Sequence, residues 1–296
     1  MNYLIVGGTG FIGKNFICAL DKSENKVFVF STTSYKKIKN CHMIRDLNSI
    51  SEDEQIDVII NLGGENIYSI WTPSKKDKLY SGKVNTAEQL VKLVERLKAK
   101  PQIMITASSL CYYGPNHKEI ITENTYPLKS YFYSLYNTIE STGDDVKNFG
   151  TRHCIIRMGI VIGKSGGFFK KIRWPFLCGV GTKFGTGEQN ISWIHIFDVI
   201  AAIYHLVYNK NSQGIYNLCS PNYLSNLTFT EKLKSFFKRK FVVNFSEKII
   251  KLFFKQMGKE LLLGNYKAKP QRLLNENFEF KYLNFDEALN SLKKEI

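Results

Sequence analysis

The chain of 296 residues lacks several features that would place it in particular classes of protein. It has no run of about 18 apolar residues, so we expect no membrane span. An apolar run at residues 3–6 leaves no room for a signal peptide before it. The six cysteines are widely scattered, and no pair has metal-ligand or redox spacing. These features predict a cytoplasmic protein with reduced thiols, no bound metal and no membrane partner.

Acidic residues are too few to balance the basic ones, and the formal net charge is +15. The excess is nearly all Lys, spread along the whole chain, whereas Arg is sparse. Surfaces that clamp phosphates or read bases usually favour Arg. We therefore expect no nucleic-acid partner, although a positive field would favour a small phosphorylated or carboxylated ligand.

The most informative stretch is a glycine-rich motif close to the start of the sequence. The apolar run at 3–6 is typical of a buried strand, and Phe16 and later apolar residues recur at helical intervals. Gly7, Gly10 and Gly13 lie between them. A sharp strand-to-helix turn leaves backbone N–H groups unpaired at the positive end of the helix dipole. The spacing therefore predicts a pyrophosphate site, as in dinucleotide-binding proteins.

Strands and helices alternate through the first half of the chain. The predicted strands cover residues 2–6, 26–31, 57–62, 102–107 and 153–162, and the clearest helix covers 84–98. A helix at about 196–209 and a strand at 214–218 continue the pattern. This order predicts an α/β fold of the Rossmann type, with a doubly wound parallel sheet and ligands at the carboxyl ends of its strands.

Two later regions depart from the alternating pattern. Residues 163–187 are rich in glycine, and we expect a long functional loop with little regular structure. From Leu227 onward the chain reads as mainly helical. The basic amphipathic segment 247–257 is of a type that can lie on a membrane, but we favour a covering helix of a small domain.

Eight blocks of sequence, spread over the whole chain, carry a resemblance to a known family. They are Gly-Gly-Thr-Gly-Phe-Ile-Gly at 7–13, Asn-Leu-Gly-Gly-Glu-Asn-Ile at 61–67, Ser108-Ser109 with Tyr112-Tyr113-Gly114, Arg157-Met-Gly-Ile-Val, Gly166-Gly167 with Gly187-Glu-Gln, Trp193-Ile-His-Ile with Asp198, Tyr216-Asn-Leu-Cys-Ser-Pro, and Lys269-Pro-Gln-Arg-Leu with Asp286-Glu-Ala-Leu. The chain resembles the extended short-chain dehydrogenase/reductase superfamily, and within it the "epimerase family" branch related to nucleoside-diphosphate-sugar epimerases.

The resemblance implies a cofactor domain and a small, mainly helical substrate domain with the active cleft between them. We assign residues 1–162 and 192–221 to the first domain, and residues 163–191 and 222–296 to the second. Dimers are common in the superfamily, so we expect a monomer or a homodimer. The implied cofactor is NADP or NAD, and the implied substrate is a small polar molecule, with a sugar nucleotide as one candidate.

The end of the second strand normally decides between the two cofactors. An Asp or Glu there would accept hydrogen bonds from the ribose hydroxyls and repel a 2′-phosphate. This chain has Ser31 and Thr32 there, followed by Lys36 and Lys37, and no carboxylate in that stretch. We therefore predict a preference for NADP; the alternative is that this stretch is only a polar surface loop.

The catalytic pair of the superfamily, a Tyr followed four residues later by a Lys, is absent. In that pair the Lys lowers the pKa of the Tyr, which then transfers the proton. Alignment on Glu140 places Phe132 at the Tyr position and Tyr136 at the Lys position. This absence removes the usual proton relay and leaves a non-catalytic cofactor sensor as the alternative to an enzyme.

Other side chains are candidates for the catalytic role. Ser108 or Ser109 takes the place of the superfamily's hydroxyl donor, and Tyr112, Tyr113 and Glu65 follow predicted strand ends. Each also has an ordinary interpretation as a turn, packing or solvated loop residue.

For two further residues, His195 and Arg157, a structural role is an alternative to a functional one. For His195 we favour a structural histidine bonded to Asp198 or to the backbone. Arg157 faces either a ligand phosphate or a structural carboxylate, and the sequence does not separate these two.

The predicted cofactor site combines the glycine motif with the ends of the second and third strands. Its members are Gly7, Thr9, Gly10, Phe11, Ile12, Gly13, Ser31, Thr32, Asn61, Leu62 and Gly63.

Overall fold

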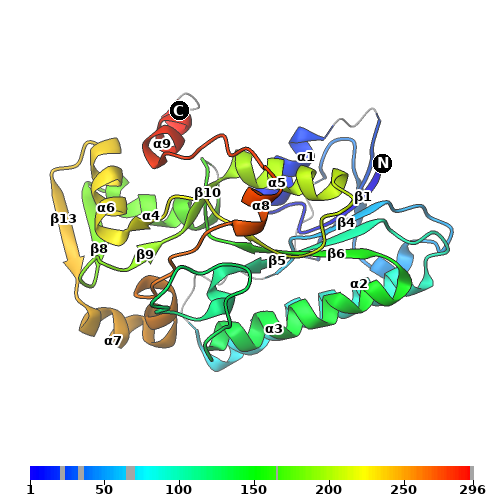
Figure 1. Ribbon diagram of the computed structural model, residues 1–296, viewed down its shortest axis with the longest axis horizontal. Helices are drawn as coiled ribbons and strands as arrows, with labels where there is room; N and C mark the ends of the chain where they lie inside the picture. The colour runs from blue at the N-terminus through cyan, green and yellow to red at the C-terminus, as the bar shows by residue number, and fades with distance from the viewer. Residues whose placement is uncertain (21–23, 33–36, 65–70, 165, 294–296) are drawn as a thin grey trace.

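The computed structural model describes residues 1–20, 24–32, 37–64, 71–164 and 166–293 (Figure 1). Seven parallel strands form the main sheet in the order β11-β6-β5-β4-β1-β2-β3. They are β1 (Asn2–Val6), β2 (Lys26–Phe30), β3 (His42–Ile44), β4 (Val58–Asn61), β5 (Ile103–Ser109), β6 (Arg152–Met158) and β11 (Gly214–Leu218). The chain order reverses direction between β1 and β4, so the carboxyl ends of these two strands border the expected ligand crevice.

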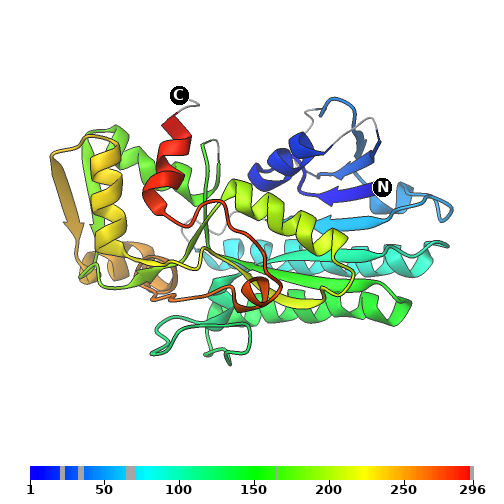
Figure 2. The ribbon, with the colours of Figure 1, turned by 45° about the horizontal axis from the view of Figure 1, so that its top comes forward.

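Helices cover both faces of this sheet, as the sequence predicts (Figures 1 and 2). One face carries α1 (Phe11–Ala19) and α5 (Ile196–Tyr208), and the other carries α2 (Pro73–Arg96) and α3 (Tyr131–Asp144). Each face buries its own apolar cluster: Phe16 and Ile203 lie in the first, and Leu90 and Val94 in the second. The doubly wound parallel sheet is confirmed.

The predicted strand at 153–162 is in fact two strands, because the chain leaves the main sheet at Gly159. A Cβ atom at Gly159 would lie 2.6 Å from the Ser192 carbonyl oxygen, so the backbones approach too closely for a side chain. After this point β7 (Ile160–Ile162) pairs in parallel with β10 (Trp193–His195) instead. The short edge strand β3 did not appear among the sequence predictions.

The expectation of little regular structure at 163–187 is wrong. The segment contains α4 (Gly167–Leu177) and β8 (Val180–Phe184), and β9 (Asn190–Ile191) follows it. Phe169 and Phe176 give α4 a buried apolar side. Glycines with positive φ, among them Gly179 (φ +98°), mark the turns between elements rather than a continuous loop.

The C-terminal part of the chain is mainly helical, but two of its strands pair with the strands β8 and β9. Its elements are β12 (Leu224–Ser225), α6 (Asn226–Phe236), β13 (Phe241–Phe245), α7 (Glu247–Met257), α8 (Gln271–Asn275) and α9 (Phe285–Lys293). β13 pairs with β8, and β12 pairs with β9, so segments distant in sequence lie side by side. The exact domain boundaries stay a prediction.

Shorter elements complete the fold. The segments Leu47–Ser49, Leu110–Tyr113 and Asp145–Phe149 are 3₁₀ turns, and Gly258–Leu262 is a π-helical turn.

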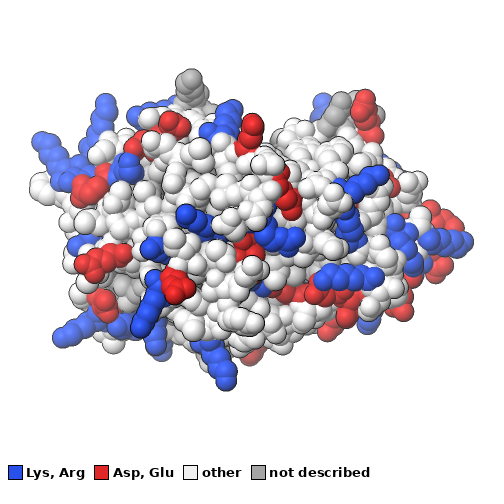
Figure 3. Space-filling model, viewed as in Figure 1, with Lys and Arg blue, Asp and Glu red and all other residues white. Residues whose placement is uncertain are grey.

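The helix α7 is amphipathic: Ile250 and Met257 are buried, whereas Leu252 and Phe253 are exposed. Among the described residues, every helix is too short or too polar to cross a membrane. On the face shown in Figure 3, Lys and Arg are interspersed with Asp and Glu.

Candidate functional site

The glycine motif forms a tight turn between β1 and α1. Gly7 has φ +75°, and a Cβ atom there would lie 2.7 Å from the Leu62 carbonyl oxygen. Gly10 is the residue that caps α1, and it offers no side chain to the first helical amides. A Cβ atom at Gly13 would lie 2.6 Å from the Gly7 carbonyl oxygen, so only glycine allows the helix to pack this closely. The amides at the helix start therefore remain open to an anion.

This turn is one wall of a cavity of about 340 Å³. Nine of the predicted site residues line it: Gly7, Gly10, Phe11, Ile12, Gly13, Leu62, Gly63, Ser108 and Ser109. Eight further lining residues were not predicted to belong to the site: Gly64, Lys83, Ala107, Tyr136, Met158, Gly159, Val161 and Gly167. The structure thus brings the candidate phosphate loop and the candidate catalytic hydroxyls to a single cavity.

Four predicted cofactor residues lie outside this lining. Thr9 and Ser31 contact each other, with their hydroxyl oxygens 3.3 Å apart, and Thr32 beside them is exposed. Asn61 is buried and accepts the Gly63 backbone N–H at 3.1 Å through its side-chain oxygen. Asn61 therefore shapes the turn after β4, whereas the other three form a polar edge at the end of β2.

Ser108 belongs to a buried cluster that also contains Glu140 and Arg157. The Ser108 hydroxyl donates to Glu140 Oε1 at 2.5 Å. Arg157 donates to both oxygens of the same carboxylate, from Nε at 3.1 Å and from Nη2 at 2.6 Å. Burial alone would lower the pKa of Arg157, but the hydrogen bonds and charge of Glu140 outweigh it and raise that pKa. Of the two roles left open for Arg157, the structure shows the structural carboxylate.

The two candidate tyrosines pack around this cluster rather than lining the cavity. The Arg157 guanidinium carbon lies 3.5 Å from the centre of the Tyr112 ring. Tyr113 is fully buried, and its hydroxyl donates to Asn217 Oδ1 at 2.8 Å. Burial raises the pKa of Tyr113 far above its usual value, so its phenol stays protonated. Both rings stabilise the position of Arg157.

Lys83 and Tyr136 are the lining residues whose chemistry the sequence analysis missed. Lys83 extends from α2 and donates to the Gly63 carbonyl oxygen at 3.2 Å. Its ammonium also lies 5.7 Å from the centre of the Tyr136 ring on α3. A signal was present, because Lys83 precedes Ala87 and Leu90 at helical spacing and so shares their buried side of α2.

Burial lowers the pKa of Lys83 from 10.5 to about 8. The cause is desolvation of the ammonium, which favours the neutral amine. A group that titrates near pH 8 exchanges protons readily under physiological conditions. The titratable ammonium of Lys83 thus lies beside Tyr136, the residue that the alignment on Glu140 matches with the superfamily's lysine.

Two other candidates stay apart from this arrangement. Glu65 lies outside the described residues. His195 accepts the Phe197 backbone N–H at 3.1 Å through Nδ1, and its Nε2 lies 3.2 Å from Ser291 Oγ. Burial and the charge of Lys281 lower the pKa of His195 to about 4. Asp198 instead accepts the backbone N–H groups of Lys281 and Tyr282, so the histidine is a structural one bonded to the backbone.

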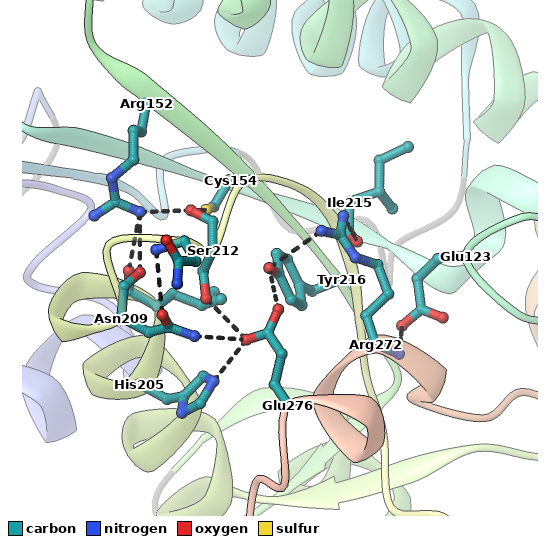
Figure 4. Close-up of polar contacts among 12 residues, drawn as sticks. Glu123, Arg152, Cys154, His205, Asn209, Ser212, Ile215, Tyr216, Arg272 and Glu276 are labelled. Atoms are coloured by element: carbon teal, nitrogen blue, oxygen red, sulfur yellow. Dashed lines mark hydrogen bonds and ion pairs between the residues drawn. The ribbon is translucent and has the colours of Figure 1, made fainter.

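A second cluster of polar contacts gathers around Glu276, which follows α8 (Figure 4). Its carboxylate contacts His205, Asn209, Ser212 and Tyr216 at distances between 2.6 and 3.1 Å. None of these residues lines the cavity of the glycine turn. The cluster ties the C-terminal segment to α5 and β11.

These features define a dinucleotide-binding α/β protein, and comparisons with known proteins give its family. Residues 3–219 match the model of the NAD dependent epimerase/dehydratase family, and residues 247–292 match a domain of unknown function, DUF1731. The chain belongs to the NAD dependent epimerase/dehydratase family. It is 30% identical to an Epimerase family protein of Staphylococcus epidermidis over 299 residues, which cover 99% of each chain.

Solved structures share the fold over the whole chain. A human epimerase family protein, SDR39U1, crystallised with NADPH, has a TM-score of 0.88 and 23% identity, with 100% of both chains covered. The UDP-glucose 4-epimerase of Thermotoga maritima, crystallised with UDP-glucose, has a TM-score of 0.78 and 18% identity, covering 100% of this chain and 99% of its own. Family membership supports a nicotinamide cofactor without showing which one.

Proposed function

We propose that the chain is an oxidoreductase that binds NADP in preference to NAD and acts on a small substrate with a carbonyl or hydroxyl group. The observation that carries this proposal is the single cavity lined by the glycine turn, Ser108, Ser109, Lys83 and Tyr136. A phosphate site alone would fit a mere binding protein. Titratable and hydroxyl groups in the same cavity support proton-transfer chemistry beside a bound cofactor.

The residues present fit a dinucleotide. Gly10 has open space on its Cβ side apart from the Gly7 carbonyl oxygen at 3.1 Å, so a pyrophosphate can approach the helix start. The ammonium of Lys83, which contacts the Gly63 carbonyl oxygen, adds a positive charge to the same cavity. When bound, the nicotinamide would give or accept the hydride, and the chain would supply position and electrostatics.

The preference for NADP rests on the end of β2. No carboxylate occurs between residues 31 and 41, so nothing in that stretch repels a 2′-phosphate. Buried Ser31 and exposed Thr32 offer hydroxyl groups there, and Lys37 is exposed; Lys36 lies outside the described residues. Titration of the protein with each cofactor tests the preference, and tighter binding of NAD would overturn it.

Three side chains would share the chemistry at the reacting oxygen. Lys83, in its ammonium form, would donate a proton to that oxygen in the direction of reduction and take one back in oxidation. Ser109 would donate a hydrogen bond to the same oxygen. Because the Ser108 proton already lies toward Glu140, the Ser108 oxygen would accept a hydrogen bond from a substrate hydroxyl or a ribose hydroxyl. Tyr112 and Tyr113 would hold Arg157 in place rather than react, and Glu65 lies outside the described residues.

The second candidate function is a cofactor-binding sensor without turnover. Phe132 favours it, because this fully buried ring occupies the position of the missing catalytic Tyr and packs against Trp71. Loss of reduced-cofactor absorbance by more than one equivalent per chain, with a panel of carbonyl compounds and sugar nucleotides, supports the enzyme. Absence of such loss with every compound supports the sensor.

Substitution of Gly10 by Asp tests the placement of the cofactor. A carboxylate at this position would occupy the space of the pyrophosphate and repel it, so we expect cofactor affinity to fall by about 100-fold or more. Gly82→Asp is the matched control, because Gly82 lies in α2 with nothing within 4 Å of its Cβ position. Wild-type affinity in Gly10→Asp would overturn the proposed site.

A further inference from the structure

A second cavity, of about 70 Å³, adjoins the cofactor cavity. Ser109, Met158 and Gly159 line both of them, so the two spaces meet at the end of β5 and β6. The rest of the second cavity is built by the region of α4, β8, α6 and the π-helical turn. A substrate whose reacting atom lies near Ser109 would therefore extend into this space.

Apolar side chains dominate the wall of the second cavity. They include Leu110, Ile160, Ile172, Phe229, Leu233 and Leu262. Among the described residues that line it, none is Lys, Arg, His, Asp or Glu. Burial raises the pKa of the lining thiol of Cys111 to about 11, so that group is neutral at physiological pH. The wall therefore offers no charge to balance the anionic diphosphate of a sugar nucleotide.

The polar groups of this wall are largely occupied by the protein itself. The Ser192 hydroxyl donates to the Tyr266 carbonyl oxygen at 2.8 Å and accepts the Ala268 N–H at 3.0 Å. The Thr230 hydroxyl donates to the Thr182 carbonyl oxygen at 3.2 Å. A ligand inside this cavity would consequently meet an environment that rewards burial of hydrocarbon rather than hydrogen bonding.

The mouth of the second cavity is polar, in contrast to its apolar wall. Ser109 Oγ accepts the Cys111 backbone N–H at 3.2 Å, and its hydroxyl also lies within hydrogen-bonding reach of the Cys111 thiol. Ser109 thus presents a hydroxyl at the boundary between the two cavities. A carbonyl oxygen would bind at this boundary, and the rest of the molecule would lie in the apolar space.

We infer that the substrate is a carbonyl compound, or the corresponding alcohol, with a compact uncharged hydrocarbon arm, and not a sugar nucleotide. The inference rests on the proposed oxidoreductase function. The cavity has room for about five or six atoms of the size of water oxygen, which sets the length of the arm. Reduction would add a hydride to the carbonyl carbon and a proton to its oxygen, as the nicotinamide is oxidised.

The experiment uses the full chain with NADPH and a series of straight-chain methyl ketones from acetone to nonanone. We expect kcat/KM to rise about fourfold for each added methylene, because each one is transferred from water into an apolar space. The rise should end at an arm of about five or six carbon atoms and then reverse. Dihydroxyacetone and UDP-glucose serve as polar comparisons and should be turned over far more slowly.

A variant that enlarges the cavity should move the optimum of this series. Leu233→Ala removes a fully buried lining side chain, so we expect the best ketone to become longer by about two or three carbon atoms. Leu206→Ala is the matched control, because Leu206 is equally buried but lies in α5, outside the cavity. An unchanged optimum in a folded Leu233→Ala protein would overturn the inference.

Binding without turnover separates this inference from the proposed function. Hexanone and UDP-glucose are titrated calorimetrically into the chain, with and without NADPH. Tighter binding of hexanone supports the apolar substrate class even if no ketone is ever reduced, in which case the proposed reaction fails alone. Tighter binding of UDP-glucose, or no binding of hexanone to protein that binds NADPH, overturns the inference while the cofactor site stands.

Discussion

Glu140 and Glu276 are two carboxylates that hold comparable numbers of hydrogen bonds in different parts of the molecule. Glu140 lies on α3 and accepts from Ser108 and from two nitrogens of Arg157. Glu276 follows α8 and accepts from Tyr216 and Ser212, and it also contacts His205. The side chain of Glu140 is 7% exposed, against 22% for Glu276.

The difference between them lies in what their partners face. Ser108 lines the cavity of the glycine turn, so the hydrogen bond to Glu140 fixes the direction of a proton at the candidate site. The partners of Glu276 hold α5, β11 and the C-terminal segment together and reach no part of that cavity. Similar hydrogen-bond chemistry thus serves positioning in one place and assembly of the fold in the other.

Neutralising Glu140 should have the largest effect. Glu140→Gln keeps the shape of the side chain but leaves the guanidinium of Arg157, which is 2% exposed, without its counter-charge. Because an uncompensated buried charge is costly, we expect a loss of about 3–5 kcal/mol in the free energy of unfolding. Urea denaturation measures this loss.

A double variant shows whether the loss of stability comes from the uncompensated charge of Arg157. Glu140→Gln combined with Arg157→Met removes both charges, so it should be less destabilised than the sum of the two single variants. Strict additivity of the two substitutions, or a cost for Glu140→Gln no larger than that of Glu276→Gln, would contradict the comparison.

The ammonium of half-buried Lys83, in contrast to the Arg157 guanidinium, contacts a carbonyl oxygen instead of a carboxylate. We expect Lys83→Met to reduce turnover by about 100-fold, the usual contribution of a positioned proton donor. Reduction by the wild type should decline as pH rises through about 8, because the ammonium then loses its proton. A pH–rate profile that keeps the same decline in Lys83→Met would exclude this role.

Lys83→Met should lower turnover, but it should not lower stability at neutral pH. The folded pKa of about 8 lies below the ordinary value of 10.5, so the unfolded chain binds more protons between these pH values. Wild-type stability therefore gains a contribution as pH rises from about 8 to 10.5, and Lys83→Met should lack this gain. At neutral pH the variant should be at least as stable as the wild type, as measured by its melting temperature.

The sequence predicted the parallel sheet and the glycine turn because local signals determine both. Apolar runs give the strands, and the spacing of Gly7, Gly10 and Gly13 gives the turn. The hydrogen bond between Ser108 and Glu140 could not be predicted from the sequence, because it forms only when the fold packs α3 against β5. Lys83 was hidden for a similar reason: an isolated lysine on a helix resembles a solvated residue unless the partner helix α3 is known.

Ser108 and Ser212 allow Glu140 and Glu276 to be compared through one hydrogen bond each. Each hydroxyl donates to one of the two carboxylates, at 2.5 Å and 2.8 Å respectively. Both Ser→Ala variants should lose about 1 kcal/mol of stability. Turnover should fall by about tenfold or more only in Ser108→Ala, because only this oxygen lines the cavity. Equal turnover in the two variants would place Ser108 among purely structural residues.

The smallest effect is expected at Glu276 itself. Burial tends to raise the pKa of Glu276, but hydrogen bonds from Tyr216, His205 and Ser212 outweigh it and hold that pKa below 4.5. The charged form therefore stabilises the fold above this pH, and the contribution disappears as pH falls through the lowered pKa. Glu276→Gln should cost about 1 kcal/mol at neutral pH, and cofactor affinity should not change.

Urea denaturation of the wild type and of Glu276→Gln across the acidic range tests this last effect. The two stabilities should converge as pH falls, because protonation removes from the wild type the charge that the substitution removes at every pH. A gap that persists below the lowered pKa would show that the shape of the amide, and not the lost charge, destabilises the variant. A loss of cofactor affinity would show instead that the Glu276 cluster supports the site, and the division between positioning and assembly would fail.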